Sequence, residues 1–291
     1  MGYVAVATDE GKAVLGRRDI LICWRGTMTD LEWFKDALAF FYSASDIFGD
    51  NPHHDAKVHM GFHSIYTAKS NFSDYNKTSA KEQILSEVRK LVDKYQDEEI
   101  SITVTGHSLG AALATMTGVD IASNGYNKPS NKEGKACPVT VMAFGSPRVG
   151  NEDFKKAVSQ IKDLHILRIR NASDGITSLP PDLFSYVDVG QQLAIDTNKS
   201  PYLLPGVNPH NLEIYLHGVA GTQGLFGEFK LVIDRCRSLV NKHLKALNPE
   251  LTPNVPEQWW IEKNKDMVQQ DDGSWELDDY VPPPLSTTTA S

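Results

Sequence analysis

Hydrophobic positions fall into short continuous runs that alternate with segments of helical periodicity. The runs predict a strand over residues 3–7 and buried strands over residues 19–24, 100–104, 138–144 and 164–170. Between them, residues 79–95 repeat apolar side chains at helical spacing and open with Ser79-x-x-Glu82, the pattern of a capping box. Such alternation predicts an α/β fold with a mostly parallel central sheet and helices on both faces.

The pattern loosens after Asn171, where prolines punctuate a loop-rich stretch. We predict a helix from about Leu212 and a second helix over about residues 233–247. Residues 259–275 are interpreted as a hairpin that turns at Asp271-Asp272-Gly273. We expect one domain over residues 1–281 and a disordered tail over residues 282–291, which are rich in Pro, Ser and Thr.

Composition and charge narrow the class of protein. The 291 residues carry a net charge of −8, which argues against a nucleic-acid partner and against a polybasic membrane-binding surface. A lipid substrate that the protein contacts through apolar side chains is compatible with this charge. The sequence has no apolar run long enough for a transmembrane segment and no signal peptide at residues 1–7. Three widely spaced cysteines suggest no disulfide framework and favour a reducing compartment.

The strongest chemical signal is Gly106-His107-Ser108-Leu109-Gly110, a G-x-S-x-G motif between a β-branched run and a small-residue helix. A strand, a sharp turn and a helix in this order form a nucleophile elbow, which exposes the serine hydroxyl. The helix N-terminus supplies N–H groups and a positive dipole end to an oxyanion formed beside it. The sequence therefore predicts Ser108 as a nucleophile.

An activated serine needs a general base and a carboxylate that orients the base. Asp174 fits the acid because it follows the strand ending near Arg170; Asp182 and Asp188, deeper in the proline-rich loop, are rivals. For the base, His210 stands just before the predicted helix and His217 lies within it. Position favours His210 but leaves both open.

The oxyanion needs two donors. The motif assigns one to the N–H of Leu109, and the other usually comes from the loop after an earlier strand. Thr27, in the turn after the strand at residues 19–24, is the candidate for the second, with a plain strand-end turn as the alternative. A helical stripe follows that turn. It is either a core helix or, as its position favours, a lid that covers the site and turns toward lipid at an interface. Its apolar side chains are Leu31, Trp33, Phe34 and Leu38.

Other signals are weaker. His59 and His63 have i, i+4 spacing, and His53 and His54 lie nearby, but no H-E-x-x-H pattern is present and Gly61 is expected to interrupt the helix. We therefore predict no metal. Ser146 is followed by Pro147, which has no N–H to donate to an oxyanion, so Ser146 is interpreted as structural. The sequence contains neither G-x-G-x-x-G nor a Walker motif.

Several segments together resemble the class 3 lipase family, and more closely the plant class II phospholipase A1 enzymes. The segments run over nearly the whole chain: Cys23-Trp24-Arg25-Gly26-Thr27, Lys57–Phe62, Thr105–Ala114, Phe144–Gly150, Arg168–Asn171 and His210–His217. The resemblance implies an α/β-hydrolase fold, no cofactor and a catalytic set of Ser108, Asp174 and His210. It also implies Thr27 as the oxyanion residue.

This resemblance implies a cytoplasmic enzyme that cleaves the sn-1 acyl ester of phospholipids, with only transient contact at a membrane surface. A neutral-glyceride or galactolipid lipase is the alternative within the class, and a lipase-like signalling protein that binds partners is the alternative outside it. Two departures stand out. Gly175-Ile176-Thr177 follows Asp174 where the family has x-Val-Pro, which could loosen that turn, and the family carries a further segment ahead of residue 2.

Overall fold

The computed structural model describes residues 1–27, 40–49, 55–131, 135–224, 226–233, 235–260 and 264–278. It divides into two compact units, unit 1 over residues 1–195 and unit 2 over residues 196–291. Each unit is described by itself. The expected lid at residues 29–41 and the expected tail at residues 282–291 lie largely or wholly outside the described residues. A single domain over residues 1–281 stays a prediction.

Unit 1 is built on a six-stranded sheet of order β1-β2-β5-β6-β7-β8. Only β1 is antiparallel, pairing with β2; every pairing from β2 to β8 is parallel. The predicted mostly parallel sheet is therefore confirmed, with β8 as a strand the hydrophobic pattern did not indicate. Its strands are β1 (Gly2–Val6), β2 (Arg18–Trp24), β5 (Ile100–His107), β6 (Val139–Phe144), β7 (Leu164–Asn171) and β8 (Gln191–Ile195).

A separate two-stranded sheet pairs β3 (Phe41–Ser43) with β4 (Lys57–His59). The unit also has short 3-10 turns, η1 (Gly175–Ser178) and η2 (Asp182–Phe184). Its helices are α1 (Asp9–Leu15), α3 (Ser45–Phe48), α4 (Met60–Thr67), α5 (Ala80–Lys94), α6 (Leu109–Ser123) and α7 (Glu152–Ser159).

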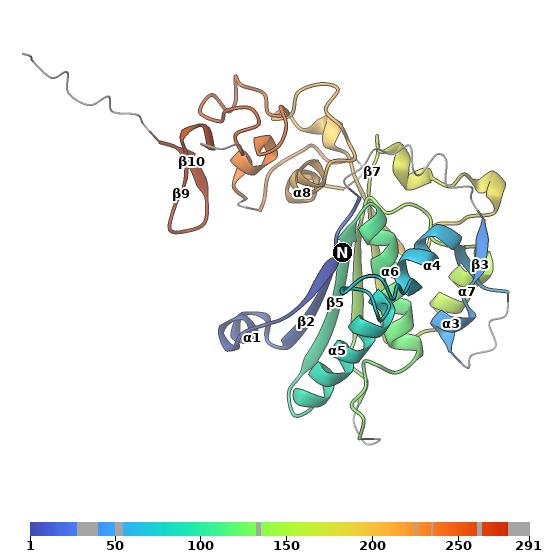
Figure 1. The fold of residues 1–291 in the computed structure, drawn as a ribbon. Helices are drawn as coiled ribbons and strands as arrows, with labels where there is room; N and C mark the ends of the chain where they lie inside the picture. The colour runs from blue at the N-terminus through green and yellow to red at the C-terminus, as the bar shows by residue number, and fades with distance from the viewer. Residues whose placement is uncertain are drawn as a thin grey trace, which may run out of the picture. The chain divides into compact units, whose positions relative to one another are not determined.

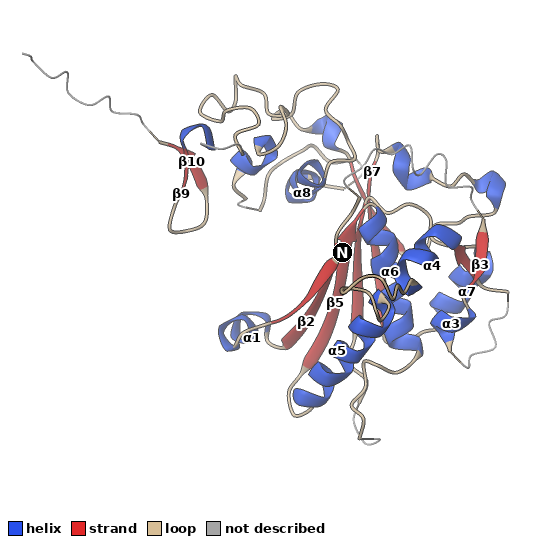
Figure 2. Ribbon diagram, viewed as in Figure 1, coloured by secondary structure: helices blue, strands red, loops and turns tan. Residues whose placement is uncertain are grey.

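Helix α6 lies along the middle of the sheet, with α4, α5 and α7 on the same side (Figures 1 and 2). Alternate strand residues point away from α6, and on that face Met142 and Leu193 are exposed. We expected helices on both faces; in the described part of unit 1, cover by helices is seen along one. The reason is visible in β5, where Ile and Val alternate with Ser and Thr, a pattern typical of a sheet buried on one side.

The core lies between the sheet and this helical layer. Ile20, Ile22, Val104 and Val141 from the strands are buried against α6, of which residues 109–121 are all buried. Small residues on α6 allow this close packing, because a side chain at Gly118 would overlap Val141. The amphipathic helix α5 begins at Ser79 with the predicted capping box and is confirmed almost to the residue.

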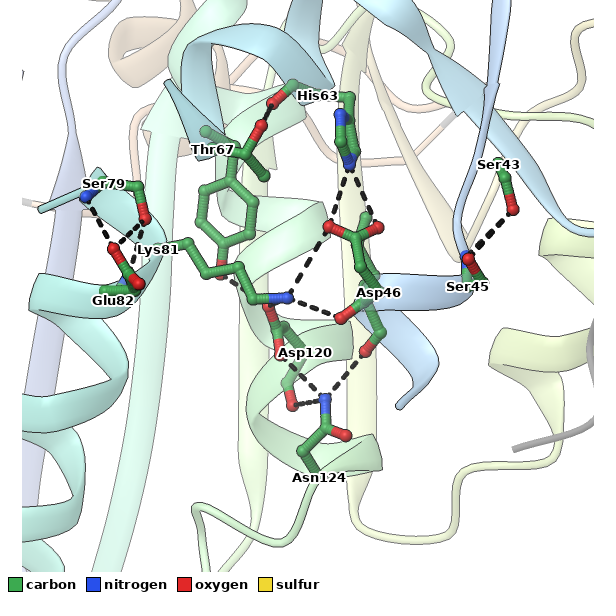
Figure 3. A network of polar contacts seen from close by, with 12 residues as sticks. Ser43, Ser45, Asp46, His63, Thr67, Ser79, Lys81, Glu82, Asp120 and Asn124 are labelled. Atoms are coloured by element: carbon green, nitrogen blue, oxygen red, sulfur yellow. Dashed lines mark hydrogen bonds and ion pairs between the residues drawn. The ribbon is translucent and has the colours of Figure 1, made fainter. Parts of the chain in front are cut away.

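Polar groups tie the helices of this layer to one another, as Figure 3 shows. Lys81 of α5 lies 3.0 Å from Oδ2 of Asp120 on α6, and its Nζ also donates to the carbonyl of Asp46 on α3 at 2.5 Å. His63 of α4 meets the Asp46 carboxylate at 2.9 Å. Asn124 donates to Oδ1 of Asp120 at 2.8 Å. One chain of contacts thus joins α3, α4, α5 and α6.

Unit 2 has its own small core around α8 (Leu212–Gly221), which confirms the helix expected from Leu212. Leu203, Ile214, Val240 and Leu247 are buried together there. Its other elements are η3 (Thr197–Lys199), η4 (Arg237–Asn241), η5 (Asn264–Asp266), β9 (Met267–Gln269) and β10 (Trp275–Leu277).

Two expectations in unit 2 need correction. The helix predicted over residues 233–247 is wrong, because the described residues of that span form only the 3-10 turn η4. The Asn241 side chain accepts the N–H groups of Ala246 and Leu247, which bends the backbone away from a helix. The hairpin does turn at Gly273, but its strands are β9 and β10, so it starts later than residue 259. Trp259 is instead buried and donates to the carbonyl of Ser238 at 2.7 Å.

Candidate active site at the carboxyl edge of the sheet

Ser108 occupies the sharp turn between β5 and α6. Its backbone has φ 57° and ψ −125°, a left-handed conformation that non-glycine residues seldom adopt. Its N–H donates to the carbonyl of Phe144, at the end of β6, over 3.0 Å. The strained turn is held by the strand before it and the helix after it, as a nucleophile elbow requires.

Close backbone approach explains the glycines of the motif. A Cβ on Gly106 would collide with the carbonyl of Gly110, because the strand and the first turn of α6 fold back on each other here. Gly26, in the turn after β2, shows the same crowding: a Cβ there would lie 2.8 Å from the His107 carbonyl oxygen and 3.7 Å from the Ser108 Cβ. The turn after β2 therefore passes directly beside Ser108.

This proximity brings both sequence-predicted oxyanion donors near the serine. Leu109 is the first residue of α6, ahead of Ala111, whose N–H donates to the Ser108 carbonyl at 3.0 Å. Thr27 follows Gly26 and is half-buried. The N–H groups of these two residues are the candidates for an oxyanion hole beside Ser108, an assignment that stays a prediction.

Asp174 lies past the carboxyl end of β7, two strands from β5 in the same parallel sheet. It is 2% exposed and caps η1: its carboxylate accepts the Ile176 N–H at 2.9 Å, and its carbonyl accepts the Thr177 hydroxyl at 2.8 Å. The carboxyl ends of parallel strands meet at one edge of a sheet, so Asp174 and Ser108 share that edge.

The rival carboxylates are engaged elsewhere. Asp182 pairs with Arg148, and its side chain is 82% exposed. Asp188 accepts from Arg148 at 3.1 Å and from Arg168 at 3.2 Å. Of these three carboxylates, that of Asp174 is the buried one, and a backbone N–H fixes its position.

The two candidate histidines both belong to unit 2 and differ in setting. His217 lies inside the unit, 2.7 Å from the Ser200 hydroxyl and stacked on Phe229. Burial, helped by the charges of Arg235 and Arg237, lowers the pKa of His217 to about 4. It is therefore held neutral within the core of unit 2.

His210 instead stands in the turn before α8, where its N–H donates to the Asn208 side chain at 3.0 Å. Asn211 follows as the N-cap of the helix. This turn places His210 ahead of the helix, whereas His217 lies within it. The contrast with His217 supports His210 as the base, an assignment that stays a prediction.

Other sequence candidates fall into structural roles or outside the described residues. Leu31, Trp33, Phe34 and Leu38, the expected lid residues, lie outside them. Ser146 is buried, and its hydroxyl donates to the carbonyl of Pro147 at 2.8 Å.

The histidine pair needs one correction. Gly61 does not interrupt the helix, because α4 runs from Met60 to Thr67. His59 nevertheless caps α4 by accepting the Gly61 N–H, and burial lowers its pKa to about 4. His63 pairs with Asp46. Among the described residues, no group of three or more His, Cys, Asp or Glu side chains could hold a metal ion.

Sequence reasoning missed the side chains that hold the Asp174 turn. Arg168 and Arg170 of β7 both reach Thr177, Arg168 at its carbonyl and Arg170 at its hydroxyl. Two arginines at alternate positions of a mainly apolar strand were the available signal, because such residues share one face.

A parallel sheet with helices beside it and a strained serine between its central strand and a helix defines an α/β-hydrolase. The profile of the family Lipase (class 3) matches residues 21–184. The chain is 52% identical over 283 residues to Phospholipase A1-II 1 of Oryza sativa subsp. indica, covering 96% of this chain and 69% of that protein. It is 49% identical over 285 residues to Phospholipase A1-IIgamma of Arabidopsis thaliana, covering 96% and 67%. The chain belongs to the class 3 lipase family.

Among solved structures, the fold is similar to a lipase propeptide complex of Rhizomucor miehei in a deletion-mutant form, with TM-score 0.49 and 23% identity. That likeness covers 68% of this chain and 52% of the other. A lipase from Rhizopus microsporus var. chinensis gives TM-score 0.47 and 25% identity, covering 67% and 56%. The chain thus spans about half of each fungal chain.

Proposed function

We propose that this protein is a serine acyl hydrolase that cleaves the sn-1 acyl ester of phospholipids. The observation that carries the reaction class is Ser108 in a left-handed turn, with the Gly26 turn against it and α6 beginning behind it. Identity of 52% and 49% to proteins named phospholipase A1 supports the substrate class.

In the first half-reaction, His210 takes the proton of the Ser108 hydroxyl as the oxygen attacks the ester carbonyl carbon. The N–H groups of Leu109 and Thr27 stabilise the oxyanion of the tetrahedral intermediate, and Asp174 stabilises the protonated imidazole. The intermediate collapses as His210 returns the proton to the leaving glycerol oxygen. A lysophospholipid departs and the fatty acyl group stays on Ser108.

In the second half-reaction, water attacks the acyl-enzyme while His210 accepts a proton from it. The same donors stabilise the second oxyanion. Collapse breaks the bond to the Ser108 oxygen, which regains its proton from His210, and the fatty acid is released. The cycle needs no cofactor.

We further propose that unit 1 meets the lipid surface through apolar side chains beside this edge. Leu183 and Phe184 of η2 are 86% and 50% exposed, and Phe40 and Met60 are exposed as well. The hydroxyl of Tyr186 donates to the Phe40 carbonyl at 3.2 Å, and the Met60 N–H donates to the same oxygen at 2.9 Å. Through Tyr186, these contacts connect the segment of Leu183 and Phe184 to Phe40 and Met60.

Bridges through Gly150 connect this region to the carboxyl edge. Gly150 follows β6 and bridges both Val58 of β4 and Val187. A net charge of −8 leaves little attraction to anionic headgroups, so apolar insertion is the contact that fits. Among the residues that the structure describes, no helix is long and apolar enough to cross a bilayer.

The surface contact is tested by sedimenting the protein with phosphatidylcholine vesicles. Replacing Leu183 and Phe184 by Ser should weaken binding several-fold and leave turnover of a soluble short-chain ester unchanged. Val14→Ser is the matched control, because Val14 is 87% exposed on α1 yet precedes β2, at the other edge of the sheet. Equal binding of the Leu183/Phe184 variant and the control would overturn the contact.

The reaction is tested with phosphatidylcholine carrying different labels at sn-1 and sn-2. Wild type should release the sn-1 label, and Ser108→Ala should release neither. A fluorophosphonate probe should label wild type and not Ser108→Ala. Faster release from a neutral glyceride or a galactolipid would move the substrate to that class. Labelling with no turnover of any ester would instead favour a signalling protein.

We also propose a cytoplasmic location. Its support is chemical: Cys23, Cys137 and Cys236 are all free thiols, which suits a reducing compartment. Fractionation of cells expressing the tagged protein is the measurement, and recovery in a secreted fraction would contradict the proposal.

A further inference from the structure

We infer that Arg170 and Thr177 are positioning residues for the Asp174 carboxylate. The inference rests on the proposed role of Asp174 in catalysis. Arg170, Thr177 and Asp174 form one chain of hydrogen bonds that begins on β7 and ends at the backbone carbonyl of Asp174.

The chain starts on one face of β7. Arg168 and Arg170 are two residues apart, so both side chains point to the same side of the strand. Arg168 is 3% exposed and donates from Nη2 to the carbonyl of Thr177. Arg170 donates from Nε to the Thr177 hydroxyl at 3.1 Å and from Nη2 to the Ser178 hydroxyl at 3.3 Å.

The second link is Thr177 itself, which is 1% exposed. Its hydroxyl accepts from Arg170 and therefore directs its own proton toward the Asp174 carbonyl, 2.8 Å away. A charged donor strengthens an accepting hydroxyl, and hydrogen bonds in a chain polarise one another. Arg170 thus acts on the acid turn through Thr177.

The third link is the turn that the chain closes. The Asp174 carboxylate accepts the Ile176 N–H at 2.9 Å, at the start of the η1 turn. The last two carbonyls of that turn, those of Thr177 and Ser178, accept from arginines outside it. Arg148 holds the far end, donating to the carbonyls of Ser178 and Pro180 at 3.2 and 3.1 Å. The Gly175-Ile176-Thr177 sequence, which departs from the x-Val-Pro of the family, is thereby fixed at both ends.

Three variants separate positioning from general support of the fold. Thr177→Val keeps the shape and removes the hydroxyl, Thr177→Ser restores it, and Arg170→Met removes the charge. The control is Arg17→Met: Arg17 also donates from Nε to a hydroxyl, that of Ser101 at 2.7 Å, but it precedes β2. Kinetics use a soluble short-chain ester, so lipid binding does not enter.

We expect Thr177→Val and Arg170→Met to lower kcat about 10- to 100-fold with KM little changed, as small displacements of catalytic groups do. Thr177→Ser and Arg17→Met should stay near wild type. The acidic limb of the kcat/KM pH profile should move to lower pH in the slow variants, because a displaced carboxylate stabilises a protonated base less. Mere loss of fold would not move that limb.

Asp174→Asn, measured beside them, separates this inference from the proposed function. If Asp174→Asn is inactive while Thr177→Val and Arg170→Met keep wild-type kcat and pH profile, the positioning role is overturned and the function stands. If Asp174→Asn keeps full activity, the acid assignment itself is wrong. Should Thr177→Val fail to fold, Arg170→Met and its pH profile decide the question.

Discussion

Lys81 and Asp120 form an ion pair between α5 and α6, with Nζ 3.0 Å from Oδ2 and the Asp120 side chain 1% exposed. Burial raises the pKa of Asp120, although Lys81 and the Tyr66 hydroxyl, which donates at 3.1 Å, act against that rise. The pair lies near the end of α6 remote from Ser108. The pair therefore helps to fix the helix that begins directly after Ser108.

Replacing Lys81 alone should destabilise the protein more than replacing Lys81 and Asp120 together. Lys81→Met leaves a buried carboxylate without its counter-charge, which we expect to lower the free energy of unfolding by about 3–5 kcal/mol. The double variant Lys81→Met/Asp120→Asn should regain part of that loss. Urea unfolding of the singles and the double gives the coupling energy. Purely additive losses would contradict the pairing.

The loss in Lys81→Met should shrink as pH falls, because a protonated Asp120 needs no counter-charge. For an acid whose folded pKa is raised, folding favours the protonated form, so stability is retained at low pH and declines as pH rises through that pKa. Unfolding curves at several pH values between neutral and acidic conditions test this sign.

A buried neutral histidine makes unit 2 sensitive to acid. The folded pKa of His217 is about 4, against about 6.5 in an unfolded chain. Below about pH 6.5 the unfolded chain binds a proton that the folded one does not, so stability falls until about pH 4. A pKa difference of this size between the folded and unfolded chains lowers the free energy of unfolding by at most about 3 kcal/mol.

His217→Gln tests that dependence, because an amide can still meet the Ser200 hydroxyl without titrating. The variant should lose some stability at pH 7 and show a shallower decline between pH 6.5 and 4. His59 also has a folded pKa of about 4, so it contributes to the loss of stability at low pH in both wild type and His217→Gln. Parallel curves for the variant and wild type would overturn the assignment.

The capping box of α5 predicts a local stability effect. The Ser79 hydroxyl accepts the Glu82 N–H at 3.2 Å, and the Glu82 carboxylate accepts the Ser79 N–H at 2.9 Å. Ser79→Ala should lower the free energy of unfolding by about 1 kcal/mol, while Ser79→Thr, which keeps a hydroxyl, should change it little. Thermal unfolding compares the two; an equal loss would mean that packing and not capping is responsible.

The parts of the fold that sequence predicted were those with strong local patterns. The β-branched run of β5 predicts a strand, and the capping box and amphipathic pattern of α5 predict a helix, without any tertiary information. The edge strand β8 does not, because its Gln-Gln start is polar and exposed and only pairing with β7 makes it a strand. The false helix over residues 233–247 arose because periodicity does not reveal the Asn241 side chain competing for backbone N–H groups.

The candidate site was predictable where a residue follows a recognisable strand. Ser108 and Asp174 both do, and both lie at the carboxyl edge. Position along the chain left His210 and His217 both open, and the resemblance favoured His210. The contacts of His217 with Ser200 and Phe229 support that preference, which stays a prediction. The support of Asp174 by Arg170 also escaped notice, because a strand arginine gives no sign of the turn to which it will bond.

Thr27 offers the last test, because its proposed role in holding the oxyanion could be performed by its N–H or by its hydroxyl. The Gly26 turn lies against Ser108, because a Cβ added to Gly26 would be 3.7 Å from the serine Cβ, and Thr27 is the next residue in that turn. Thr27→Val keeps the N–H and the side-chain shape but removes the hydroxyl. Loss of one oxyanion donor lowers kcat by about 10²–10³-fold in other hydrolases.

We expect a kcat loss approaching that range in Thr27→Val if the hydroxyl donates, with KM nearly unchanged because the oxyanion forms only in the transition state. Thr27→Ser should remain close to wild type. Thr27→Val should still react with a fluorophosphonate probe, though slowly, since Ser108 stays in place. A Thr27→Val enzyme with wild-type kcat would contradict a donating hydroxyl and leave the N–H as the only possible donor of this residue. Gly26→Ala, whose added Cβ would lie 2.8 Å from the His107 carbonyl oxygen and so displace the turn, should then be the variant that loses activity.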